Sequence, residues 1–183
     1  MQFSTLTILA GAIAGVQACS GPPVNQATVD LVANFEGFRA NEYIDPTGNP
    51  TIGYGHLCRS RGCPDVPYPK PLSVANGKKL LASDLRVAQD CIYRATADPV
   101  KLNANQYGAL VSWSFNVGCG NARSSSLIAR LNRGENPQAV IANELPQWNH
   151  GGGKVLPGLT RRRKAEVDLA NSPTSQPALP HFC

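Results

Sequence analysis

FEGFRANEYIDPTGNPTIGYGH, residues 35–56, is the stretch of sequence that indicates the fold. It begins where Gln26–Glu36, a segment with apolar residues at helical spacing, is expected to end. Asp45–Pro50 is dense in turn-forming residues and lies between two short β-prone runs, Glu42–Ile44 and Thr51–Tyr54. These patterns predict a helix followed directly by a β-hairpin.

The remainder of the chain is mostly helical in pattern. Leu57–Pro71 is rich in Pro and Cys and predicts a covered loop, and Ser73 is a suitable cap for one long helix that continues to about Ala95. The later segments predict, in order, helices over 103–117, Ser124–Asn132, Pro137–Trp148 and Thr160–Ala170, with a glycine hinge at His150–Gly153. One hairpin followed by many helices favours an α+β fold.

The composition is that of a soluble globular protein. The chain has 183 residues, of which 42% are hydrophobic and 16% charged, and its mean hydropathy is -0.20. These values exclude a mostly disordered chain. Seventeen Lys and Arg against 12 Asp and Glu give a net charge of +5, which suits an anionic partner. Because no aromatic platform or nucleic-acid-binding motif accompanies the basic residues, we expect no nucleic-acid function.

The first eighteen residues predict a secretory signal peptide. Residues 1–18 carry no charged side chain, contain a short apolar stretch and end in small residues, so we expect cleavage after Ala18 and an extracellular mature protein of residues 19–183. The apolar stretch is too short to span a bilayer, and no later segment is long enough, so we expect no membrane insertion. A buried N-terminal helix is the alternative.

Six cysteines remain after such a cleavage. In an oxidising compartment an even number implies disulfide bonds, although sequence alone does not choose among the 15 possible connectivities. Cys58 and Cys63 are close enough to form a small loop. Cys19 and Cys183 could tie the termini, which leaves Cys91 with Cys119. The cysteine spacings match no zinc module and the histidines are scattered, so we expect no metal.

Two carboxylates stand out as candidates for acid–base chemistry. Glu36 ends an apolar helix, and a carboxyl group held against apolar surface tends to keep its proton, as a general acid must. Asp45 starts a polar turn, where a carboxylate tends to stay ionised. Hairpin pairing is expected to bring Thr51 beside Asp45, so that the two could hold a water as an inverting glycoside hydrolase does. The alternatives are a solvated Glu36 and an Asp45 that only forms the turn.

The 35–56 stretch resembles the active-site segment of phage-type lysozymes, glycoside hydrolase family 24. Three later blocks are similar to the family in the same order, namely LNANQYGALVSWSFNVGCG, SSSLIARLNRGE and W-N-x-GGGKVLPGLTRRRKAE. The resemblance implies a two-lobed lysozyme-like fold with a cleft between the lobes. It also implies hydrolysis of the β-1,4 bond between N-acetylmuramic acid and N-acetylglucosamine in bacterial peptidoglycan. The hairpin lobe would cover about residues 37–72, and the helical lobe about residues 73–183 plus the N-terminal helix.

The resemblance also assigns roles residue by residue. Glu36 would be the general acid, Asp45 the general base and Thr51 the residue that positions the attacking water. Substrate contacts are expected from Leu57, Phe115 and Asn116, for which packing or helix capping are the alternatives. No cofactor is expected, and the protein is expected to act as a monomer on the anionic bacterial wall. A chitinase-like hydrolase and a non-catalytic wall-binding protein remain the alternative functions.

Two further contacts are expected around this site. In the run Arg161–Lys164, successive side chains differ in direction by about 100°, so one of them, Arg161 or Arg162, is expected to turn inward to Glu36. His56 follows the hairpin, and we predict that it forms an ion pair with Asp84 on the long helix, as the family pattern also suggests. Trp113 and Trp148 are expected to pack in the core rather than stack on sugar.

Overall fold

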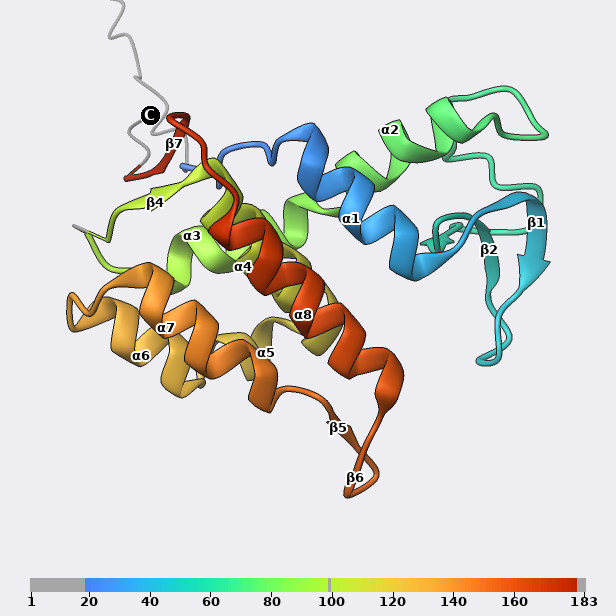
Figure 1. The fold of residues 1–183 in the computed structure, drawn as a ribbon. Coiled ribbons are helices and arrows are strands. Elements are labelled where there is room, and N and C mark those ends of the chain that lie inside the picture. The colour runs from blue at the N-terminus through green and yellow to red at the C-terminus, as the bar shows by residue number, and fades with distance from the viewer. Residues whose placement is uncertain (1–18, 99, 181–183) are drawn as a thin grey trace, which may run out of the picture.

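Figure 1 shows a computed structural model of the chain, which describes residues 19–98 and 100–180. The predicted signal peptide lies outside the described residues, and so does Cys183. The helices are α1 (Gln26–Glu36), α2 (Val74–Asp84), α3 (Arg86–Ala95), α4 (Ala104–Val117), α5 (Cys119–Arg123), α6 (Ser126–Asn132), α7 (Pro137–Glu144), the short 3₁₀ helix η1 (Leu145–Gln147) and α8 (Pro157–Asn171). The strands are β1 (Arg39–Ile44), β2 (Pro50–Gly53), β3 (His56–Leu57), β4 (Leu102–Asn103), β5 (His150–Gly151), β6 (Lys154–Val155) and β7 (Pro177–Leu179).

The predicted α1 and the hairpin after it are confirmed. The Asn25 side chain caps α1 by accepting a hydrogen bond from the N–H of Thr28, and Gly37 ends the helix at a φ of 72°. β1 and β2 form the antiparallel hairpin, and β3 adds a third strand in the order β1-β2-β3. The chain therefore leaves α1 at Glu36 and enters the sheet within three residues.

The single long helix predicted after Ser73 is interrupted. Ser73 caps α2 as expected, but α2 ends at Asp84 and α3 begins at Arg86. At Leu85 the backbone has a ψ of -13°, and its N–H is shared between the carbonyls of Leu81 and Ser83. Because an α-helical ψ is near −42°, the helix tightens for one residue there. The apolar pattern alone did not indicate this.

α4 is the central helix of the larger core. It starts with a reciprocal cap in which the Asn103 side chain accepts from the N–H of Gln106, and the Gln106 side chain accepts from the N–H of Asn103. Ten of its residues are buried, and α1, α3 and α8 pack around it. Figure 1 shows α8 lying in front of α4, and α8 also contacts α1. This packing brings the C-terminal helix to the end of α1.

The predicted glycine hinge is instead a second β-hairpin. β5 and β6 pair with His150 opposite Val155 and Gly151 opposite Lys154. The two residues between them, Gly152 and Gly153, have φ values of 59° and 76°. A two-residue hairpin turn with positive φ at both positions is the type that matches strand twist, and glycine adopts it without strain.

Two of the expected disulfides are present, Cys58–Cys63 and Cys91–Cys119. The first lies in a small hydrophobic cluster with Ile52, Val66, Leu72 and Leu80, and the second joins α3 to α5. The expected Cys19–Cys183 pairing cannot be followed, because Cys183 lies outside the described residues. The small cluster supports the sheet, and a separate, larger cluster supports the helices.

The contact between α1 and α4 leads to a stability prediction. A Cβ atom on Gly108 would lie 1.9 Å from Oγ1 of the buried Thr28, whereas a Cβ atom on Gly120 would meet no heavy atom within 4 Å. We expect Gly108→Ala to lower the free energy of unfolding by roughly 1–3 kcal/mol through overpacking. Gly120→Ala should leave it unchanged or raise it slightly. Thermal unfolding of both variants measures this, and a neutral Gly108→Ala would contradict the packing described.

Candidate active site

One face of the three-stranded sheet carries one of the candidate residues. Thr51 on β2 lies directly opposite Tyr43 on β1 and Leu57 on β3. Residues that are directly opposite share a face, so these three side chains form a row across the sheet. The next residue, Ile52, belongs to the buried cluster on the other face. The alternation therefore presents Thr51 on the face away from the small core.

Glu36 lies at the C-terminal end of α1, where it meets α8. Its carboxylate accepts a hydrogen bond of 2.7 Å from Nη1 of Arg162. The Arg162 side chain is 5% exposed and the Glu36 side chain 27%, and the same guanidinium lies 5.6 Å from the Phe35 ring centroid. The prediction that an arginine turns inward is thus confirmed for Arg162, while Arg161 is exposed. The Glu36 carboxylate is held in place by a cation that is itself buried.

A buried charge network lies behind this contact. Glu166, fully buried on α8, accepts hydrogen bonds from Arg162 Nε at 3.3 Å, Arg163 Nη2 at 3.0 Å and Ser112 Oγ of α4 at 2.7 Å. Burial raises the pKa of the Glu166 carboxyl, and the two guanidiniums oppose that effect. Arg163 also donates to the Asn116 side chain at 3.0 Å. The network therefore connects α4, α8 and the end of α1.

Sequence reasoning did not find Glu166 or Ser112. The i, i+3 and i, i+4 spacings of Arg163 and Arg162 from Glu166 were a usable signal for the pairs within α8. Nothing local indicated Ser112, because its contact with Glu166 joins residues 54 positions apart.

Asp45 forms the start of the β1–β2 turn. Its carboxylate accepts hydrogen bonds from the N–H of Asn49 at 2.8 Å, the N–H of Thr47 at 2.9 Å and the Thr47 hydroxyl. The Asn49 N–H, followed by the Thr47 hydroxyl, lowers the pKa of Asp45 below its ordinary value. Asp45 is therefore ionised at neutral pH, as predicted for a residue in a polar turn.

The expected direct pairing of Asp45 with Thr51 is wrong. Ile44 pairs with Pro50, and the N–H of Asp45 bonds to the carbonyl of Asn49 at 2.9 Å, so Asn49 is opposite Asp45. Thr51 is two residues further along β2, on the same face and diagonal to Asp45. Thr51 as a whole residue is 2% exposed, and its hydroxyl donates to the Asn49 carbonyl at 3.2 Å. The register differs from the prediction because the hydrogen bonds between β1 and β2 continue past Ile44 and Pro50 into the turn.

The three predicted substrate contacts have different surroundings. Leu57 is 59% exposed, beside Thr51. Phe115 is half-buried against the larger core. Asn116 is exposed at the end of α4 and accepts from Arg163. Helix capping does not explain Asn116, because Gly118 is the C-cap.

Core packing is confirmed for Trp113, which is fully buried and meets the half-buried Trp148 edge-on with 5.2 Å between ring centroids. The predicted contact between His56 and Asp84 is also present, with Nδ1 2.9 Å from the carboxylate.

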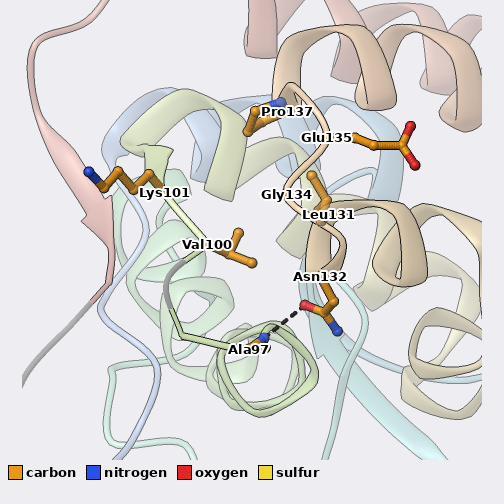
Figure 2. Close-up of a pocket in the computed structure, with 8 residues that line it drawn as sticks. All are labelled: Ala97, Val100, Lys101, Leu131, Asn132, Gly134, Glu135 and Pro137. Carbon is orange, nitrogen blue, oxygen red and sulfur yellow. Dashed lines mark hydrogen bonds between the residues drawn. The ribbon is translucent and has the colours of Figure 1, made fainter.

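A separate hollow lies away from Glu36, Asp45 and Thr51. Figure 2 shows it between the α3–β4 and α6–α7 connections, where the Asn132 amide accepts from the N–H of Ala97 at 2.8 Å and Glu135 faces outward toward its own arginine partners. Over residues 19–98 and 100–180, no group of three or more His, Cys, Asp or Glu could hold a metal ion. No helix in those ranges is long and apolar enough to cross a membrane.

Comparison with known proteins places this arrangement in a family. Residues 33–166 match the sequence profile described as phage lysozyme, and the matched region contains Glu36, Asp45, Thr51 and the arginine network. The chain belongs to the phage lysozyme family. In solved structures, its lysozyme-like α+β fold is similar to a variant of P22 lysozyme, with a TM-score of 0.69, 29% identity and coverage of 82% of this chain and 99% of that one.

Other relatives agree with the phage lysozyme assignment. The muramidase domain of SpmX from Asticaccaulis excentricus has a TM-score of 0.65 and 29% identity, covering 82% of this chain and 98% of that one. The endolysin of Bacillus phage PZA is 37% identical over 153 residues, which is 82% of this chain and 56% of the endolysin. The chain therefore spans about half the length of that endolysin. The SAR-endolysin of bacteriophage PS119 is 34% identical, with coverage of 74% of this chain and 75% of that protein.

The hydrogen bonds of Asp45 lead to a titration prediction. We expect NMR to give this carboxyl a pKa below about 3.9, the ordinary aspartate value. Thr47→Val, which removes the hydroxyl donor, should raise the pKa, and Thr47→Ser should leave it low. A lowered folded-state pKa adds stability that is present above the unfolded value and is lost as the pH falls through the folded value. An ordinary pKa in the wild type would refute the turn geometry.

Proposed function

We propose that the protein hydrolyses the β-1,4 bond between N-acetylmuramic acid and N-acetylglucosamine in bacterial peptidoglycan. One observation carries this proposal: two carboxylates in the family-matched region are each held by specific donors, Glu36 by the buried Arg162 and Asp45 by its own turn. The names of its relatives, endolysins and a muramidase domain, support the same activity.

The proposed reaction is a single displacement. Glu36 gives its proton to the leaving oxygen as the glycosidic bond breaks, and Asp45 takes a proton from a water whose oxygen bonds to the anomeric carbon. The negative charge left on Glu36 is offset by the guanidinium of Arg162, 2.7 Å away. Asp45 suits the base because its turn keeps it ionised. All atoms and protons of the reaction are accounted for by the substrate, one water and the two carboxyl groups.

Thr51 is proposed to position that water. Its hydroxyl proton is directed to the Asn49 carbonyl, so the oxygen lone pairs remain available to accept a hydrogen bond from water. Its place diagonal to Asp45, on the same face of the sheet, would let both residues hold one water between them. Leu57, Phe115 and Asn116 are proposed to contact the glycan.

The proposal extends to the export of the protein, its domain organisation and its attraction to the bacterial wall. Residues 1–18 would be a signal peptide, and residues 19–183 one secreted catalytic domain with a hairpin lobe and a helical lobe. The domain would act as a monomer without a cofactor, and the net charge of +5 would favour the anionic bacterial wall.

The first test removes each carboxyl group. Glu36→Gln and Asp45→Asn should each lower the release of reducing ends from purified peptidoglycan by about 10²–10⁴-fold, because one loses the acid and the other the base. Asp168→Asn, which removes an exposed carboxylate on α8, is the matched control and should stay near wild type. Pelleting with walls should show that Glu36→Gln still binds.

Each alternative function has its own outcome in this assay. Faster hydrolysis of chitin oligomers than of peptidoglycan would favour a chitinase-like enzyme. Wall binding without any release of sugar by the wild type would favour a non-catalytic binding protein. Glu36→Gln at wild-type rates would disprove the assignment of the acid.

The second test is stereochemical. Attack by water on the face opposite the leaving group inverts the anomeric carbon, so the first product seen by NMR should be the α anomer. Spectra recorded in the first minutes precede mutarotation. A β product would mean retention, with Asp45 acting as a nucleophile.

A further inference from the structure

His56 is held on both sides by carboxylates from two other segments. It lies on β3 with its side chain 16% exposed. Nδ1 lies 2.9 Å from Oδ1 of Asp84 at the end of α2, and Nε2 lies 3.2 Å from Oδ2 of Asp65. Asp65 belongs to the irregular segment of residues 58–71 between β3 and α2, called here the disulfide loop. One ring thus joins the sheet, the disulfide loop and the helix.

The number of protons on the ring decides whether both contacts can exist. A neutral imidazole has one N–H donor and one bare nitrogen, whereas the imidazolium has two donors. An ionised carboxylate only accepts, so a bare nitrogen beside one gives two acceptors facing each other. The imidazolium therefore satisfies both Asp65 and Asp84, and the neutral ring satisfies one of them. Asp65 and Asp84 are the charged groups that face the ring from the elements packed against it.

The two carboxylates differ in how much they depend on the ring. Asp65 has a second donor, because its Oδ1 accepts from the N–H of Arg59 at 3.1 Å. Burial raises the pKa of Asp84, which means that this carboxylate is poorly solvated and gains most from the ring proton. The contact with Asp84 is also the shorter of the two. A neutral ring would keep its one proton on Nδ1, and Asp65 would lose its contact with the ring while keeping the N–H of Arg59.

The contact with Asp65 adds a tie from the disulfide loop to β3, next to Val66, which is buried in the small cluster. Gly62 donates to the Glu42 carboxylate at 2.6 Å, and Lys70 donates to the Cys63 carbonyl at 2.6 Å. Together with the Cys58–Cys63 bond, these contacts hold residues around 62 and 63. Asp65 joins the part of the loop that follows Cys63 to His56 on β3. His56 directly precedes the exposed Leu57 in the sequence.

We propose that His56 is a proton-operated clamp that fastens the disulfide loop to β3 when the ring is charged and releases the loop at Asp65 when the ring is neutral. The release would loosen the backbone next to Leu57 and weaken substrate binding, and this consequence rests on the proposed function. His56 and Asp65 are positioning residues here, because neither needs to touch substrate.

Hydrogen exchange of the intact protein tests the clamp without reference to activity. After correction for intrinsic rates, exchange of residues 58–71 should rise by about tenfold between about pH 5 and about pH 9, as expected for one charge-assisted hydrogen bond. Asp65→Asn should abolish the pH dependence, because an amide can accept from Nε2–H or donate to bare Nε2. Asp65→Ala should exchange fast at every pH, and Asp168→Asn should follow the wild type.

Two results would overturn the clamp: equal protection of the loop in the wild type at both pH values, or an unchanged pH dependence in Asp65→Asn. Its effect on substrate binding has a separate readout, the ratio of wild-type KM to Asp65→Asn KM. Both proteins have the same catalytic groups, so the effect of pH on those groups cancels in the ratio. The KM ratio should rise with pH, while the corresponding ratio of kcat values stays constant. A flat KM ratio would refute the coupling to substrate, and a failure of the proposed function would show instead as no hydrolysis by any variant.

Discussion

The buried carboxylate of Glu166 is the interaction on which the candidate site depends. It is shared by two arginines of its own helix and by Ser112 of α4, and all four side chains are almost fully buried. Without Glu166, two guanidiniums would be left in the core with one charged partner at the surface, Glu36. Removing one member of such a network is costly because the remaining charges lose their compensation.

This network sets the geometry of the helical side of the site. Arg162 can reach Glu36 because its guanidinium is already oriented by Glu166 and by the Ser112 carbonyl at 3.4 Å. Arg163 uses the same carboxylate to hold the Asn116 side chain at the end of α4. One buried anion therefore orients a candidate acid and a candidate substrate contact at once, from helices that are distant in sequence.

The sheet side of the site depends on the small cluster and the disulfide loop. Because β-strand residues alternate between faces, burying Ile52 against Cys58, Cys63 and Leu72 places Thr51 on the opposite face. A shift of one residue in the pairing of β2 would exchange the faces on which Thr51 and Ile52 lie. The disulfide and the contacts of the loop with Glu42 and His56 hold this cluster against the sheet. The N–H of Cys58, the first residue of the loop, bonds to the carbonyl of Pro50 beside Thr51.

The sequence by itself determined what depends on near neighbours: the helix that ends at Glu36, the hairpin that follows it, the turn at Asp45 and, through ordered motifs, the family. Tertiary structure decided which of two adjacent arginines turns inward, that Asn49 rather than Thr51 lies opposite Asp45, and that Asp65 meets His56. Local patterns follow from backbone preference and side-chain period, which the residues themselves carry. The direction of a side chain depends on helix rotation, strand register and loop path, and these are set by the packing of segments far apart in the chain.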